Sequence, residues 1–214
     1  MNYNDIISNV EVSGMDFTIR SSKYPMATNA QKCTGEPTKM TAKLAGVPIG
    51  TAHDNFLKGI TVHFDLTFTV KAWTEAERYH FFDIVSSQSS IHRICKFDLS
   101  KQFIEYTDKR MIEIMKELAK GYNQMKEAED QIDEADHDIY YEALHEQYLR
   151  VLYSCPTGLK LTAGMVTNYQ QLKTIYFQRR HHVLPEWQCF CDWVETLPCF
   201  KEWIINPYNK RKEA

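Results

Sequence analysis

The sequence predicts a helix-rich α/β (α+β) protein, a single domain over residues 1–214 with a small antiparallel or mixed sheet. Three observations predict this class. Residues 61–73, TVHFDLTFTVKAW, alternate apolar and polar side chains, as a half-buried strand does. Residues 108–152 contain no proline and few β-branched residues, which favours long helices. Hydrophobic residues make up 43% of the chain, so it can build a sizeable core.

Charge and hydropathy exclude several classes of protein. The formal net charge of −3 gives no reason to expect nucleic-acid binding. The first residues, MNYNDIISNVEV, lack the basic-then-apolar order of a signal peptide, and no apolar run approaches the roughly 20 residues of a membrane span. We therefore expect a cytoplasmic protein that does not contact a membrane.

The six cysteines are scattered along the chain rather than paired at the spacings of a disulfide framework. In the cytoplasm they are expected to be reduced and mostly buried. Cys189 and Cys191 follow His181 and His182, but this spacing matches no zinc pattern. We predict no metal site.

The N-terminal third is predicted to contain strands and loops. VEVSGMDFTIR, residues 10–20, alternates and suggests strands that turn at Ser13-Gly14. Residues 27–59 are rich in glycine and proline and indicate loops with little regular structure. In the strand that follows, one face carries the apolar residues Val62, Phe64, Leu66, Phe68 and Val70.

Helices are predicted for most of the remainder. Thr74 and Glu77 have the spacing of a capping box, which predicts a helix over 75–86 that ends at the serine-rich SSQSS. Gly121 is expected to divide residues 108–152 into two helices. Their acidic middle, KEAEDQIDEADHD, is typical of a solvated helical hairpin. Pro185 then permits a turn into a last helix over 186–197.

The helix before that turn carries the candidate binding residues. Thr167 and Gln170 form a second capping box, so we expect a helix over 168–182. An eleven-residue separation places Asn168 and Arg179 on one helical stripe, about 16 Å apart. Leu172 and Ile175 lie between them.

An arginine fork binds a phosphate or carboxylate with two parallel hydrogen bonds, and the first turn of a helix also favours anions. We expect Arg179 to point inward and to have an anionic partner. The alternative is an ordinary amphipathic helix with a capping asparagine and a surface arginine.

Two stretches resemble the flavin-dependent thymidylate synthases. TNYQQLKTIYFQRR is similar to that family's signature helix, in which an arginine follows an asparagine by eleven residues; these are Arg179 and Asn168, with Gln178 where the family has leucine. LTFTVKAW is similar to the family's strand before its hallmark segment, and Arg78 and Ser87 fall at family-like positions. Together the stretches cover about a third of the chain. The chain also looks similar to proteins of bacteriophages.

The resemblance implies a flavin-dependent thymidylate synthase-like fold, a homotetramer with ligand sites at subunit interfaces, and a host-cytoplasmic setting. It implies binding of a pyrimidine deoxynucleotide such as dUMP, with C5 alkylation of deoxyuridylate, a methyltransferase reaction, as the candidate activity. FAD, NADPH and a folate carbon donor are implied in the same way. The substrate-binding candidates are Arg179, Arg93, Ser87 and Arg78, and the cofactor-binding candidates are Asn168 and His182. No catalytic residue is assigned.

The sequence departs from the family at the flavin clamp. The family's Arg-His-Arg slot contains Phe82, Asp83 and Ile84, and a carboxylate repels a pyrophosphate where the family supplies attraction. FAD binding is therefore expected to be weak or absent. This leaves two alternatives to an enzyme. One is a binder on the same scaffold that sequesters a nucleotide or blocks a host protein. The other is a structural or regulatory protein that uses the acidic hairpin as its contact surface.

Overall fold

The computed structural model describes residues 1–212. Their contacts divide the chain into two compact units. The first contains Met1–Thr67, Glu75–Ser86 and Ala163–Ala214, and the second contains Phe68–Thr74 and Ser87–Thr162. Each unit is thus built from segments that are distant in the sequence. The single domain over 1–214 stays a prediction.

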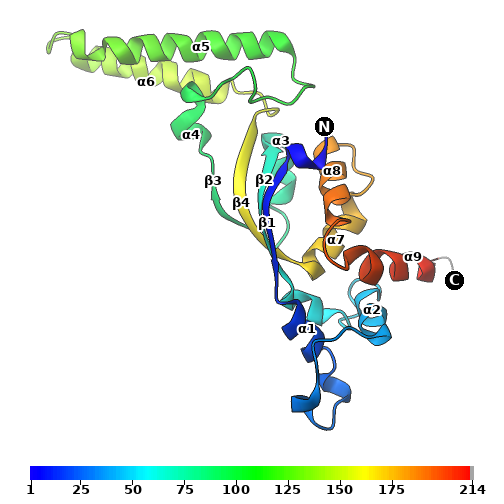
Figure 1. The fold of residues 1–214 in the computed structure, drawn as a ribbon. Helices are drawn as coiled ribbons and strands as arrows, with labels where there is room; N and C mark the ends of the chain where they lie inside the picture. Colours follow the sequence, from blue (N-terminus) through cyan, green and yellow to red (C-terminus); the bar gives the residue numbers. More distant parts are fainter. Residues whose placement is uncertain (213–214) are drawn as a thin grey trace. The chain divides into compact units, whose positions relative to one another are not determined.

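The sheet has four strands in the order β1-β2-β4-β3 (Figure 1). Strand β1 (Ile7–Ser13) is antiparallel to β2 (Thr61–Thr69), with Ile7 opposite Leu66. Strand β4 (Lys160–Asn168) is also antiparallel to β2, because Tyr169 N donates to Ile60 O (3.1 Å) at one end and Val70 N to Leu159 O (2.9 Å) at the other. The small antiparallel sheet of the predicted fold class is confirmed.

Strand β3 (Phe82–Ser87) pairs with β4 and forms one edge of the sheet. Thr167 Oγ1 donates to Phe81 O (2.5 Å) at the start of β3, and Gln88 N donates to Thr162 O (2.9 Å) after its end. These bonds run in opposite order along the two strands, so β3 and β4 are antiparallel as well.

Alternation in β2 separates a core face from an open face. Val62, Phe64, Leu66 and Phe68 are buried, as predicted, whereas His63 on the other face is exposed. Val70, predicted on the same strand face, is only partly buried and lies beyond the end of β2. In the first unit, helix α8 (Pro185–Val194) covers the core face: the ring of Phe64 lies 4.7 Å from Trp193 and 6.2 Å from Phe190, centroid to centroid. The predicted helix over 186–197 is therefore confirmed over Pro185–Val194, and it supplies the aromatic side of the core. It is not the last helix as predicted, because helical segments follow it at Lys201–Ile205 and Asn206–Lys212.

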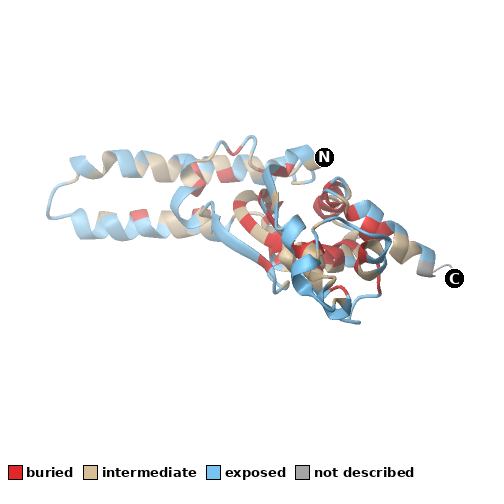
Figure 2. Cartoon of the chain, turned by 60° about the horizontal axis from the view of Figure 1, so that its bottom comes forward, coloured by how far each residue is buried: buried red, intermediate tan, exposed pale blue. Residues whose placement is uncertain are grey.

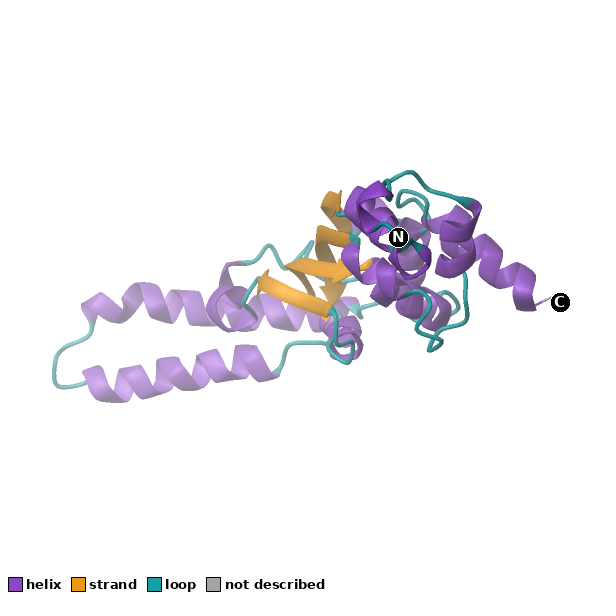
Figure 3. Ribbon diagram, turned by 90° about the horizontal axis from the view of Figure 1, so that it is seen from below, coloured by secondary structure: helices purple, strands orange, loops and turns teal. Residues whose placement is uncertain are grey.

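The helices are shown by secondary structure in Figure 3. Besides α8 they are α1 (Met15–Ser21), α2 (Lys39–Ala45), α3 (Val70–Ala76), α4 (Ser90–Arg93), α5 (Lys109–Ala128), α6 (His137–Tyr153), α7 (Tyr169–Arg179) and α9 (Asn206–Lys212), with a π-helical turn at Lys201–Ile205. In the part of the chain that the structure describes, no helix is long and apolar enough to cross a membrane.

The predicted helix over 75–86 is wrong. Helix α3 starts earlier, and the side chain of Thr69 rather than Thr74 accepts a backbone hydrogen bond at its start, from Ala72 N (3.2 Å). The Thr74 hydroxyl instead donates to Lys71 O (2.8 Å). The later residues form β3, because its backbone pairs with β4 and Phe82 is buried among aromatic rings. Tertiary pairing overrides the local capping signal.

The N-terminal third also differs from the expectation. Gly14 has φ +83 and ends β1, a conformation that glycine adopts without steric cost, and the chain then enters α1 rather than a second strand. Within the expected loops, α2 is started by a capping box between Thr38 and Thr41. That signal is a threonine pair, which the Ser/Thr-to-Glu/Gln pattern misses.

Helices α5 and α6 lie side by side and antiparallel (Figure 1). The predicted hairpin is confirmed, but its division is not at Gly121, which lies within α5; the break falls between Ala128 and His137. Gln147 Nε2 donates to Leu118 O (3.1 Å), and the Tyr140 hydroxyl donates to Met125 O (2.6 Å). Figure 2 shows that most of the hairpin surface is exposed, as expected for its acidic middle.

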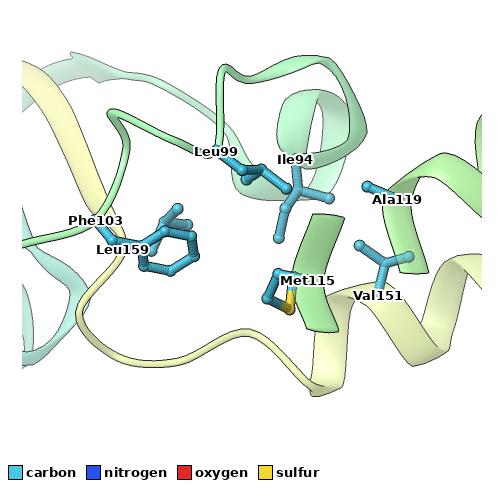
Figure 4. Close-up of a cluster of buried hydrophobic side chains, with 7 residues drawn as sticks. All are labelled: Ile94, Leu99, Phe103, Met115, Ala119, Val151 and Leu159. Carbon is cyan, nitrogen blue, oxygen red and sulfur yellow. The ribbon is translucent and has the colours of Figure 1, made fainter. Parts of the chain in front are cut away.

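The second unit has its own hydrophobic core (Figure 4). It joins the inner faces of α5 and α6 to the connecting segments on either side of them. Its fully or nearly buried members are Ile94, Leu99, Phe103, Met115, Ala119, Val151 and Leu159. The base of the hairpin is therefore anchored by burial of apolar surface.

A buried ion pair anchors α7 in the first unit. The Lys173 ammonium has no exposed surface and donates to Asp54 Oδ2 (2.6 Å), Ala45 O (2.8 Å) and Val47 O (2.6 Å). Gln170 Nε2 donates to the other carboxylate oxygen of Asp54 (3.0 Å). Every proton of the ammonium thus has a partner, which is the condition under which a buried charge is tolerated.

We expect Lys173→Met to lower the free energy of unfolding by about 3–5 kcal/mol, because it leaves a buried carboxylate unpaired. Urea denaturation measures this loss. Lys58→Met, at an exposed lysine, is the matched control and should change stability by less than about 0.5 kcal/mol. Adding Asp54→Asn to Lys173→Met should restore part of the loss. A loss at Lys173 no larger than that at Lys58 would show that the pair does not stabilise the fold.

Candidate functional site

Asn168 occupies the N-cap of α7. Its side chain accepts a hydrogen bond from Gln171 N (2.9 Å), and its extended backbone ends β4. The predicted cap was Thr167 with Gln170, which is wrong: Thr167 donates to Phe81 O, and Gln170 binds Asp54. Since Tyr169 N also donates to Ile60 O, two of the N–H groups in the first turn already have protein acceptors. Two of the four N–H groups that a helix start leaves open are thus satisfied without a ligand.

The apolar stripe of α7 faces the core, as predicted. Leu172 and Ile175 are fully buried. The stripe ends at Arg179, whose side chain is only 16% exposed. The inward direction expected for Arg179 is therefore confirmed.

Arg179 is held by residues of the same chain. Its Nη1 donates to Glu75 Oε2 (2.7 Å) and its Nε donates to the Tyr79 hydroxyl (2.8 Å). The guanidinium carbon also lies 5.1 Å from the centroid of the Trp187 ring and 5.6 Å from that of Tyr79, within the range of cation–π attraction. The anionic partner expected for Arg179 is thus a carboxylate, placed across a sequence separation of about a hundred residues.

His182 joins the same carboxylate. Its Nε2 lies 3.1 Å from Glu75 Oε2, and its Nδ1 accepts a hydrogen bond from Leu184 N (3.2 Å). Because Nδ1 acts as acceptor, the proton of the neutral ring resides on Nε2 and points at Glu75. Glu75, Arg179 and His182, with Tyr79 and Trp187, form what we call the Glu75 cluster.

The two sequence neighbours of Arg179 differ, because Gln178 contacts this cluster and Arg180 contacts another side chain. The Arg180 guanidinium lies over the Tyr176 ring at 4.9 Å, and Gln178 Oε1 accepts from the Tyr79 hydroxyl (3.0 Å). His181 is exposed. Successive residues of a helix differ in direction by about 100°, and Arg179 and Arg180 accordingly contact different side chains.

The other predicted site residues lie elsewhere. In the first unit, Arg78 is exposed in the turn between α3 and β3. In the second unit, Ser87 is exposed at the end of β3, and Arg93 is exposed at the end of α4. Of the six predicted binding residues, the structure brings Arg179 and His182 together. Glu75, Tyr79 and Trp187 were missed, and no local signal marks them, because each reaches Arg179 only through the tertiary fold.

The residues in the expected flavin-clamp slot do not fit a pyrophosphate. Phe82 is buried, with its ring centroid 5.6 Å from that of Phe190 and 6.5 Å from that of Trp187. Asp83 and Ile84 are exposed, and none of the three positions carries a cation. A carboxylate beside a diphosphate is repulsive, so this segment offers no charge-assisted contact to FAD.

The first unit contains two cavities of interest. A cavity of about 240 Å³ beside the N-terminal half of α7 is lined in part by Gln170, Gln171 and Thr174, together with Ile49 and Phe81. A larger and mostly apolar cavity, of about 1190 Å³, lies between α1, α2 and the segment before β2. Lys23 borders it, but its ammonium already donates to Thr34 O and Glu36 O (each 2.7 Å). The volume of the larger cavity suits a small molecule, but its mostly apolar lining has few groups that could bind an anion.

The thiols of Cys189 and Cys191, near α7, are made unreactive by burial. Burial raises the pKa of the Cys191 thiol to about 12 and also raises the pKa of Cys189. Both therefore stay protonated at neutral pH, whereas metal ligation needs the thiolate. Among residues 1–212 no group of three or more His, Cys, Asp or Glu side chains is placed to hold a metal ion.

No protein-family model and no curated protein matches the sequence. Solved structures do match the fold. Two crystal structures of the flavin-dependent thymidylate synthase ThyX from Helicobacter pylori, each with FAD and dUMP, superpose with a TM-score of 0.62 at 12% sequence identity. One match covers 93% of this chain and 98% of the other, and the second covers 94% and 99%. The chain has a ThyX-like fold. At this identity the ThyX likeness establishes the fold and not the chemistry.

We expect Arg179→Ala to lower the free energy of unfolding by about 2–3 kcal/mol, because it leaves Glu75 without its guanidinium and removes the stacking on Trp187. Arg180→Ala is the control and should cost about 1 kcal/mol or less, the usual scale of one cation–π contact. Chemical denaturation of Arg179→Ala, Glu75→Gln and the double variant gives the coupling between the two side chains, expected to be about 1–2 kcal/mol. Additive losses would mean that the pair does not interact in solution.

Proposed function

We propose that this chain binds a pyrimidine deoxynucleotide of the dUMP type through the Glu75 cluster. The observation that carries the proposal is the ThyX-like fold over 93% of the chain, matched to structures that contain dUMP. Arg179 lies at the end of α7, the helix that carried the resemblance in sequence. Arg78, Arg93 and Ser87 are exposed and would contribute where subunits of the expected tetramer meet.

The number of N–H donors on Arg179 supports a role in binding a phosphate. Its guanidinium carries more N–H donors than the bonds to Glu75 and Tyr79 use. A phosphate of charge near −2 would compete with Glu75 for the same fork, and its extra charge favours it. Glu75 would then act as the carboxylate that holds Arg179 in place until the nucleotide arrives, while His182 offers a second group to that carboxylate.

The enzymatic form of the proposal is C5 alkylation of deoxyuridylate, which in ThyX-like proteins draws on FAD, with NADPH and folate implied by the family resemblance. The slot at Phe82, Asp83 and Ile84 lacks the cations that FAD needs, so we favour a nucleotide binder that does not retain a flavin. Its setting as a bacteriophage protein in the host cytoplasm, or as a ligand of a host protein, is carried by the sequence resemblance alone.

We expect dUMP to bind, and the Glu75 cluster to control its affinity. Calorimetric titration should show Arg179→Ala weakening dUMP binding by about 10- to 100-fold, the value of one or more charged hydrogen bonds. Arg180→Ala should bind as the wild type does, and Arg179→Lys should recover little, because an ammonium cannot form the fork.

Glu75→Gln separates a ligand site from a merely structural cluster. It removes the competing carboxylate and should therefore strengthen dUMP binding several-fold although it weakens the fold. Circular dichroism at the titration temperature confirms that each variant is folded. If dUMP does not bind the wild type, or binds Arg179→Ala equally well, the Glu75 cluster is not a dUMP site.

We expect protein purified by gel filtration to carry no stoichiometric FAD. Loss of the charge-assisted phosphate contacts at residues 82 and 84 forfeits about 3–6 kcal/mol of binding energy relative to a complete clamp. Mass spectrometry of the small molecules released from the protein, together with the absorbance near the flavin maximum, measures this. FAD at one molecule per chain would contradict the assignment of the clamp slot.

A further inference from the structure

Strand β3 is an edge strand with few of the usual protections. It lies at the end of the strand order, and no strand in the described part of the chain pairs with its outer side (Figure 1). Soluble proteins block such edges with lysine, proline, bulges or covering segments. The sequence FDIVSS contains no lysine, arginine or proline, and its one charged residue is Asp83. Its two central residues, Ile84 and Val85, are apolar and 43% and 69% exposed.

The opposite edge of the same sheet is protected. Strand β1 carries a register shift between Ser8 and Glu11, where Asn9 has φ +52. Such a bulge twists the strand and interrupts its row of free backbone groups. Asn9 Nδ2 also donates to Asp65 Oδ2 (2.6 Å), which fixes the bulge, and the exposed Glu11 adds a charge. The β1 edge of the sheet is therefore protected against pairing with another strand, and the β3 edge is available for it.

The backbone groups of Val85 point outward from the sheet. Gln88 N donates to Thr162 O, and the carbonyl of Ser86 faces Gly164, 3.9 Å from where a Cβ on that glycine would lie. Since backbone groups alternate along a strand, residues 84, 86 and 88 face β4, and residues 83, 85 and 87 face away from it. Asp83, Val85 and Ser87 thus present N–H and C=O groups to an incoming strand.

We infer that β3 pairs antiparallel with β3 of a second copy of this chain, about a two-fold axis at Val85. The two sheets then continue into one across the axis. A two-fold contact uses the same patch on both copies, so the strand must complement itself. This assembly surface does not depend on nucleotide binding.

The sequence of β3 meets that requirement. In the Val85-centred register Val85 lies opposite Val85 of the second copy, and the apolar side chains cover each other. Asp83 lies opposite the Ser87 hydroxyl, which can donate to the carboxylate. The two Asp83 carboxylates are about 14 Å apart along the strands, beyond a Debye length at physiological salt. The backbone hydrogen bonds, the apolar contact and the charges are therefore all compatible with this register.

Val85→Pro tests the pairing. Proline removes the outward N–H, and it is tolerated in an edge strand whose N–H faces solvent, so the subunit keeps its fold. Light scattering after gel filtration should give the wild type a mass of at least twice 25.1 kDa. Val85→Pro should halve the mass of the wild-type assembly. Val85→Lys should do the same by charge repulsion. The matched control is Val10→Lys on the protected edge, where Val10 is 43% exposed, and it should leave the mass unchanged.

A cross-link distinguishes this register from any other contact. Opposite residues of an antiparallel pair have Cα atoms about 5.5 Å apart, which a disulfide can span. Val85→Cys should therefore give a covalent dimer under mild oxidation, with the introduced thiols joined to each other in the peptide map, whereas Val10→Cys should not. A wild type that stays a monomer at 100 µM chain, or a folded Val85→Pro variant of unchanged mass, would overturn the inference. Titration of dUMP into Val85→Pro tests the nucleotide site separately.

Discussion

The buried pair between Lys173 and Asp54 is the interaction on which the first unit depends. It ties the middle of α7 to the segment between α2 and β2, whose apolar residues Leu57 and Ile60 are also fully buried. The ammonium satisfies two backbone carbonyls as well as the carboxylate. A charge without exposed surface permits one geometry, because any displacement leaves a polar group unsatisfied. The fixed position of Lys173 also fixes where the two ends of α7 lie.

At the C-terminal end of α7, the fixed position of the helix places Arg179 beside Glu75. Because a guanidinium must have partners when it is withdrawn from water, the chain itself supplies a carboxylate, a hydroxyl and two aromatic faces. The Glu75 cluster is thus complete as a structural element before any ligand is considered. A ligand phosphate has to compete with Glu75 rather than fill an empty site, which makes the carboxylate as important to affinity as the arginine.

The ThyX-like fold and the local chemistry give different information about function. The fold extends over nearly the whole chain, but at positions 82–84 the side chains serve the core and the sheet edge. Phe82 is buried against Phe190 and Trp187, and Asp83 and Ile84 occupy an edge strand. A segment that supplies cations to a diphosphate in the resembled family here contributes apolar packing and an exposed apolar edge. The same scaffold can hold different chemistry because function depends on the side chains at the site and not on the fold alone.

The sequence by itself determined the elements whose periodicity is long and regular. The alternation in β2, the extent of the α5–α6 hairpin, α8 and the inward stripe of α7 were all readable, because a half-buried strand or helix must place its apolar residues on one side. Only the tertiary structure decided the rest. The Thr74–Glu77 capping signal favoured a helix over 75–86, but pairing with β4 made residues 82–87 a strand, and a local window contains nothing about β4. Glu75 and Asp54 became partners of Arg179 and Lys173 for the same reason: the partners of buried charges are chosen by contacts across about a hundred residues of sequence.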